Sequence, residues 1–169
     1  MLDSDINTNG LKVRLLQRII ARIDEEIASM SRAAQAAHEA ATHAESRSED
    51  KHDTRGLEAS YLAGAQAARV EELQRVVAKL RETPTRPFSK SEAITPGALI
   101  EAEVDGQSHL FFLITDGAAG LSLEEDGKRV QVITARSPMG QALIGRYRGE
   151  STEVEVGKHL TEVEIVSVR

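Results

Sequence analysis

The sequence contains no cysteine and no tryptophan. The lack of cysteine excludes disulfide bonds, thiolate zinc sites and cysteine nucleophiles, and it fits an expected cytoplasmic location. Two tyrosines and three phenylalanines are the only aromatic residues in a chain of 169. Because so few aromatic side chains are present, one large aromatic core is excluded. Alanine is abundant instead, which favours long helices.

A basic excess and a long apolar run are also missing. The net charge is −6, and residues 84–169 are more acidic than residues 1–83. Neither half therefore resembles a domain that binds duplex DNA by neutralising phosphates. No apolar run reaches the ~18 residues of a membrane span, and acidic Asp3 and Asp5 stand where a signal peptide is basic. We expect a protein without a membrane contact.

Two long periodic runs dominate residues 1–83. In residues 11–45 apolar side chains recur at alternating steps of four and three, which is the heptad pattern of a coiled coil; they are Leu16, Ile20, Ile23, Ile27, Met30, Ala34, Ala37, Ala41 and Ala44. Asn7 or Thr8 is the expected N-cap of this helix. Residues 56–82 repeat the pattern up to Pro84. The polar stretch 46–56 joins the two runs, so the sequence predicts an antiparallel coiled-coil hairpin whose tip is that stretch.

The apolar seam changes along the hairpin. It consists of Leu, Ile and Val at the start of the first run and the end of the second run, and of Ala near the tip that joins them. Because alanine buries little area, we expect the hairpin to narrow and to be least stable towards its tip.

The second half is predicted to be a small β-rich domain. Residues 84–97 contain three prolines and are predicted to be a linker. Residues 98–169 show four to six short strands, and Asp-Gly pairs at 105–106 and 126–127 predict hairpin turns. Ser137 as N-cap, followed by Pro138, predicts one short helix that ends before Gly145. The fold class is therefore α+β, with an antiparallel sheet covered by one helix.

The segment 137–145, Ser-Pro-Met-Gly-Gln-Ala-Leu-Ile-Gly, is followed by Gly149 and by a strand of alternating valine at 153–156. This pattern resembles the C-terminal domain of the bacterial Gre transcript-cleavage factors. The order of parts, a helical hairpin before this domain, is also similar to that family. The resemblance covers nearly the whole chain.

The resemblance implies a fold and a function. It implies that residues 98–169 have an FKBP-like fold without isomerase activity, and that this domain docks on RNA polymerase core at its secondary channel. The hairpin would then reach the polymerase active site, where two tip acids help to hold a second Mg²⁺ while the polymerase cleaves its own backtracked RNA. The chain would be a monomer, would have no cofactor of its own and would meet RNA and DNA only through the polymerase. It would not be an enzyme itself but would stimulate the polymerase's own cleavage activity.

The acids of the tip are the candidates for this role. The family's tip has Asp, then Glu three residues later, then Asn. Asp50 and Asp53 have that spacing, with Asp in the place of Glu and Thr54 in the place of Asn. We therefore assign the role to Asp50 and Asp53, with Glu49 in reserve; their carboxylates are the hard ligands that Mg²⁺ prefers.

The spacing to the following helix differs from the family pattern. In the family a Tyr follows the second acid by four positions, whereas Tyr61 follows Asp53 by eight. Glu58 lies nearer to Tyr61, but Arg55 then stands where the first acid should be. The assignment of the tip acids stays open between these registers.

The expected docking residues lie in and after the short helix: Ser137, Pro138, Met139, Arg146 and Arg148. Three functions follow from the sequence. The first is a secondary-channel binder that stimulates RNA cleavage and rescues stalled complexes. The second is a binder of the same channel that inhibits or tunes transcription without cleavage. The third is a dimerising coiled-coil adaptor with a β-rich binding domain.

Overall fold

The computed structural model describes residues 2–45, 54–157 and 159–169. Its contacts divide the chain into two compact units, one of residues 1–20 and 79–169 and the other of residues 21–78. The predicted fold class is confirmed, because two long helices precede a small sheet domain with one short helix. In the described part of the chain, no helix combines the length and the apolar character that a membrane span needs.

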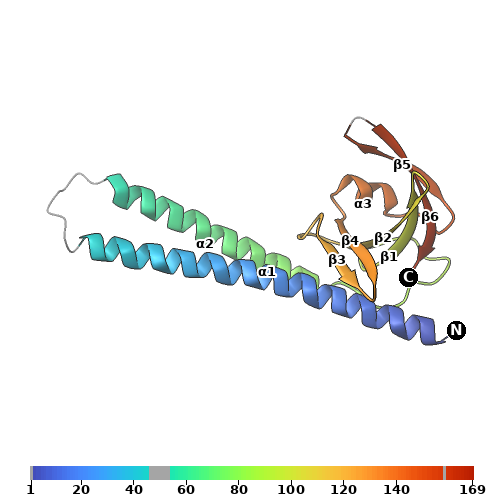
Figure 1. The fold of residues 1–169 in the computed structure, drawn as a ribbon, viewed down its shortest axis with the longest axis horizontal. Helices are drawn as coiled ribbons and strands as arrows, with labels where there is room; N and C mark the ends of the chain where they lie inside the picture. The colour runs from blue at the N-terminus through green and yellow to red at the C-terminus, as the bar shows by residue number, and fades with distance from the viewer. Residues whose placement is uncertain (1, 46–53, 158) are drawn as a thin grey trace. The chain divides into compact units, whose positions relative to one another are not determined.

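Two helices, α1 (Leu2–Glu45) and α2 (Thr54–Arg81), supply the unit of residues 21–78. They lie side by side in opposite directions (Figure 1), and Arg69 of α2 forms an ion pair with Glu26 of α1 at 3.8 Å. The expected cap at Asn7 or Thr8 is wrong, because α1 is already helical from Leu2. The predicted tip ends earlier than residue 56, since α2 begins at Thr54.

Burial in this unit follows the predicted gradient of side-chain size. Ile23, Leu73 and Val77 are each 5% exposed. Further along α1 and α2, seam positions with larger side chains are half-buried, and the alanines at 37 and 63 are exposed. In the described residues the seam is therefore well buried around Ile23 and Val77, and it is more exposed towards Ala37 and Ala63.

A six-stranded sheet forms the centre of the other unit. Its strands are β1 (Leu99–Val104), β2 (Gln107–Ile114), β3 (Ser122–Glu125), β4 (Lys128–Thr134), β5 (Ser151–Val156) and β6 (His159–Val168), in the order β3-β4-β2-β1-β6-β5. Neighbours are antiparallel except β2 and β4, which are parallel. The expectation of a purely antiparallel sheet is wrong at that pair. The helix α3 (Pro138–Leu143) packs against β4 and β5 on one face (Figure 1).

Both predicted Asp-Gly turns are confirmed. Asp105 and Gly106 have φ values of 48° and 75° between β1 and β2. Asp126 and Gly127 have φ values of 51° and 72° between β3 and β4. Positive φ at both central residues is the geometry of the tight hairpin turn that matches the twist of two strands.

The core of this unit includes side chains from outside the predicted domain. Phe88 and Ile94 lie in the segment predicted as a linker, and both are buried in one cluster with residues of the sheet such as Ile100, Phe111 and Ile165. Ile94 also exchanges backbone hydrogen bonds with the turn after α3, at Gly145 and Arg146. The domain boundaries predicted at residues 83, 84, 97 and 98 stay a prediction.

The first turns of α1 belong to the same unit as the sheet. Arg14 and Arg18 both form ion pairs with Glu125 of β3, at 2.7 Å and 2.8 Å. Hydrogen bonds from these two guanidinium groups lower the pKa of Glu125. Residues of α1 are thereby fixed to the β3–β4 hairpin by charge-assisted bonds, which are stronger than neutral ones.

Lys12 lies nearby and is fully buried. Its Nζ donates a hydrogen bond to the backbone oxygen of Arg86 at 2.9 Å and lies 4.6 Å from the centre of the Phe88 ring. The pKa of Lys12 is lowered to about 8, chiefly by burial; the positive charges of Arg86 and Arg169 also lower it, and the negative charge of Glu92 raises it. The ammonium group is thus held in an unfavourable place by a cation–π contact and one hydrogen bond.

This burial predicts that stability rises with pH. The unfolded chain keeps the Lys12 proton up to its ordinary pKa of 10.5, whereas the folded chain loses it above about 8. Folding therefore releases a proton between these pH values, so the free energy of unfolding increases as pH rises through that window. Urea unfolding of wild type and Lys12→Met across the window measures this, and the variant should lack the increase. Equal slopes for both proteins would contradict the burial of a charged Lys12.

Candidate functional site

Ser137 fixes the start of α3. Its Oγ accepts a hydrogen bond from the Gly140 N–H at 3.2 Å and donates one to the Thr134 carbonyl oxygen at 2.8 Å. Pro138 stands at the first helical position, where its missing N–H has no cost. The predicted cap is confirmed, and it ties α3 to the last residue of β4.

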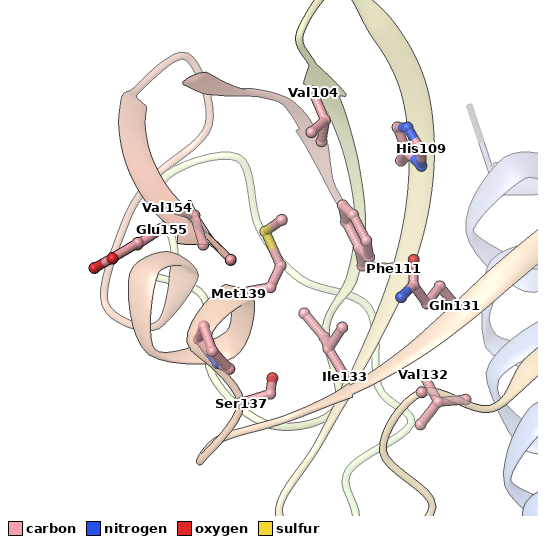
Figure 2. Close-up of a pocket in the computed structure, with 13 residues that line it drawn as sticks. Val104, His109, Phe111, Gln131, Val132, Ile133, Ser137, Met139, Val154 and Glu155 are labelled. Atoms are coloured by element: carbon pink, nitrogen blue, oxygen red, sulfur yellow. The ribbon is translucent and has the colours of Figure 1, made fainter. Parts of the chain in front are cut away.

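A pocket with a volume of about 460 Å³ lies beside α3. We call it the α3 pocket; its apolar walls are Val104, Phe111, Val132, Ile133, Met139 and Val154. Figure 2 shows the Met139 side chain lying between Val154 and Phe111. An apolar hollow of this kind suits a ligand or partner side chain that is itself apolar.

The pocket is also lined by Pro138, Gly120 and Gly157, and by four polar side chains: His109, Gln131, Ser137 and Glu155. The His109 ring stacks on the Phe111 ring, with 5.8 Å between centroids and 7° between planes. Figure 2 shows the Glu155 carboxylate at the outer side of β5, pointing away from Met139. The centre of the pocket is thus apolar, and its hydrogen-bonding groups lie around it.

The structure brings together three of the five predicted docking residues. Ser137, Pro138 and Met139 all line the α3 pocket. Arg146 and Arg148 do not; the Nε of Arg146 donates to the Ala142 carbonyl oxygen at 3.2 Å, and Arg148 is exposed. Their role in docking stays a prediction.

The predicted tip acids Glu49, Asp50 and Asp53 lie outside the described residues. Within the described ranges, no group of three or more His, Asp or Glu side chains is arranged to hold a metal ion. The assignment of Asp50 and Asp53 to a shared Mg²⁺ stays a prediction.

Sequence reasoning missed most of the pocket wall. The sequence predicted short strands in residues 98–169, but nothing in the local pattern places β2, with Phe111, beside β4, with Ile133, in parallel. The residues of the wall come from four strands and α3. The only signal in the sequence for these wall residues was the alternation of apolar and polar residues, which marks the buried face of each predicted strand.

Residues 90–169 match the family model for the C-terminal region of the transcription elongation factors GreA and GreB. In these residues the chain is similar to the GreA/GreB family. The match contains the whole sheet, α3 and the α3 pocket. The predicted family resemblance is confirmed.

Solved structures with a similar chain include GreA factor homolog 1 (Gfh1) from two Thermus species. The Thermus thermophilus protein is 20% identical, with 89% of this chain and 94% of that chain covered and a TM-score of 0.37. Thermus aquaticus Gfh1 is also 20% identical, with 90% of this chain and 94% of that chain covered and a TM-score of 0.38. A GreA/GreB factor from Nitrosomonas europaea is 20% identical, with 57% of this chain and 78% of that chain covered and a TM-score of 0.32. No curated protein matches the chain.

The geometry of α3 predicts that Gly140 tolerates no side chain. A Cβ atom at this position would lie 1.9 Å from the Thr134 carbonyl oxygen, which belongs to the backbone and cannot rotate away. Gly140→Ala should therefore move α3 and lower the free energy of unfolding. Gly64→Ala is the matched control, because its Cβ meets nothing within 4 Å and alanine favours a helix by about 1 kcal/mol. Urea unfolding compares the two, and equal stability of both variants would contradict the close approach of α3 to β4.

Proposed function

We propose that this chain is a transcription elongation factor that binds RNA polymerase core through its secondary channel and stimulates cleavage of backtracked RNA. The observation that carries the proposal is the family match of residues 90–169. The proposed partner contact is the α3 pocket, because three predicted docking residues line it. The chain would act as a monomer in the cytoplasm.

The α3 pocket has the properties of a contact for a protein partner. Its walls are apolar, and Tyr147, two residues after the 137–145 segment, is 45% exposed. Apolar side chains left open to water on one side of a small domain favour burial against another surface. Residues that fill such a pocket contribute most of the binding free energy in many interfaces.

In this proposal the hairpin supplies the effect on the polymerase. Asp50 and Asp53 would offer carboxylate oxygens to the Mg²⁺ of the polymerase active site, and the donor set fits that ion. The chain would be a stimulator of the polymerase's own cleavage rather than an enzyme. It would meet RNA and DNA only inside the polymerase.

A second candidate function is a channel-binding factor that inhibits or tunes transcription without cleavage. The sequence of the tip favours it, since Asp53 and Thr54 replace the family's Glu and Asn. Docking would be the same in both functions, because the α3 pocket is far from the tip in sequence. The difference between them would lie in the chemistry of the tip.

Cleavage of RNA in backtracked complexes distinguishes the two functions. Wild type should raise the cleavage rate above that of polymerase alone. Asp50→Asn with Asp53→Asn should lose most of this stimulation while it still binds polymerase, because the change removes the anionic ligands and keeps the side-chain volumes. The readout is the cleaved fraction on a gel over time, with binding measured on the same samples. No stimulation by wild type would favour the second function, and full activity of the double variant would overturn the assignment of these acids.

A further inference from the structure

The strand β5 is the last strand of the sheet, and among the described residues no further strand pairs with its outer edge. Ile165 N–H donates to the Glu150 carbonyl oxygen at 2.9 Å, and Asp105 N–H donates to the Glu162 carbonyl oxygen at 3.2 Å. In β6, therefore, residue 165 faces β5 and residue 162 faces β1. Because these directions alternate along an antiparallel ladder, Thr152 and Val154 bond to β6. The N–H and C=O groups of Glu153 and Glu155 face away from the sheet.

A hollow adjoins this free edge. Its volume is about 490 Å³, and it lies between α3 and β5. It is lined by Pro138, Gln141 and Ala142 of α3, by Glu153, Val154 and Glu155 of β5, and by Gly157. It shares Pro138, Val154 and Glu155 with the α3 pocket. Space for another chain segment is thus present along β5, next to apolar walls.

The outer face at this edge carries unbalanced negative charge. Glu153 of β5 stands directly opposite Glu162 of β6, and Glu164 of β6 stands opposite Glu103 of β1. All four side chains are exposed, and none has an ion pair within the part of the chain that the structure describes. Like charges directly opposite one another destabilise a sheet, so basic side chains at this edge would relieve the repulsion.

These features select among possible occupants. A second copy of β5 would set glutamates against glutamates, so self-pairing is disfavoured. A helix has no free backbone groups along its length and cannot pair with those of Glu153 and Glu155. An extended segment can pair with them, as in strand addition to an exposed sheet edge. The side chains of this segment opposite Glu153 and Glu155 would lie on the acidic face of the sheet. The side chain opposite Val154 would lie on the other face, at the hollow beside α3.

We propose that the free edge of β5 binds an extended segment of a partner protein in which basic and apolar residues alternate. Backbone hydrogen bonds to Glu153 and Glu155 hold the segment in place. Its basic side chains pair with the glutamates, and its apolar side chain enters the hollow beside α3. This surface goes beyond the proposed function, because it specifies a strand-forming partner and requires no polymerase for its test.

The probe is a blocked synthetic peptide of sequence Lys-Val-Lys-Val-Lys-Val-Lys, titrated into the full chain. Two further peptides carry N-methyl groups, one on the lysine amides and the other on the valine amides. Because alternate amides face the neighbouring strand, one methylated peptide should lose binding and the other should keep it. Hydrogen exchange at the Glu153 and Glu155 amides should slow when the unmodified peptide binds. Equal binding of both methylated peptides, or unchanged exchange, would overturn strand addition and favour a charge contact or a helical occupant.

Charge reversal supplies the second arm. Glu155→Lys should weaken the unmodified peptide by about tenfold, as the loss of a close charge pair does. Glu82→Lys changes the net charge equally, and Glu82 directly follows α2 rather than lying on the sheet, so this variant should bind as wild type does. Glu153 stands opposite Glu162, so Glu153→Lys replaces a repulsion by an attraction and should leave the sheet folded. The affinity for the peptide should nevertheless fall. Wild-type affinity in Glu155→Lys and Glu153→Lys, or no binding to wild type, would overturn the proposal.

Discussion

In the C-terminal unit, α3 begins so close to the end of β4 that a Cβ atom at Gly140 would lie 1.9 Å from the Thr134 carbonyl oxygen. The Ser137 hydroxyl bridges the same carbonyl and the Gly140 N–H, so one short turn sets both the position and the direction of the helix. Met139 is held next to this turn and lies between Val154 and Phe111 in Figure 2. The α3 pocket and the hollow beside β5 both depend on this placement.

The local pattern predicted the elements well. Ser137 and Pro138 marked the start of α3, the two Asp-Gly pairs marked hairpin turns, and the change from Ile23 to Ala37 marked the change in burial along the helices. In each case the cause is contained in a few neighbouring residues: a cap, a left-handed turn or the size of a side chain. Such features do not depend on which distant segment packs against them.

What the sequence did not predict depends on distant pairing. The parallel contact of β2 with β4 joins strands with β3 between them in the chain, and it forms part of the α3 pocket wall. Phe88 and Ile94 were taken for linker residues because prolines surround them, yet both are buried in the core. Lys12 was not singled out, since only the fold places a helical lysine against Phe88 and Arg86. The proposed function rests on the family resemblance, because these local patterns do not indicate one.

The central claim is that the α3 pocket binds RNA polymerase core, and the most direct measurement is the affinity of purified core for three full-length proteins. Wild type should bind, and Met139→Glu should weaken binding by more than about tenfold, because it places a carboxylate among apolar walls that the partner would cover. Ile144→Glu is the matched control, since Ile144 belongs to the same motif but does not line the pocket. It should bind nearly as wild type does. The same affinity for Met139→Glu and wild type, with both proteins folded, would contradict the account, and so would the absence of any binding by wild type.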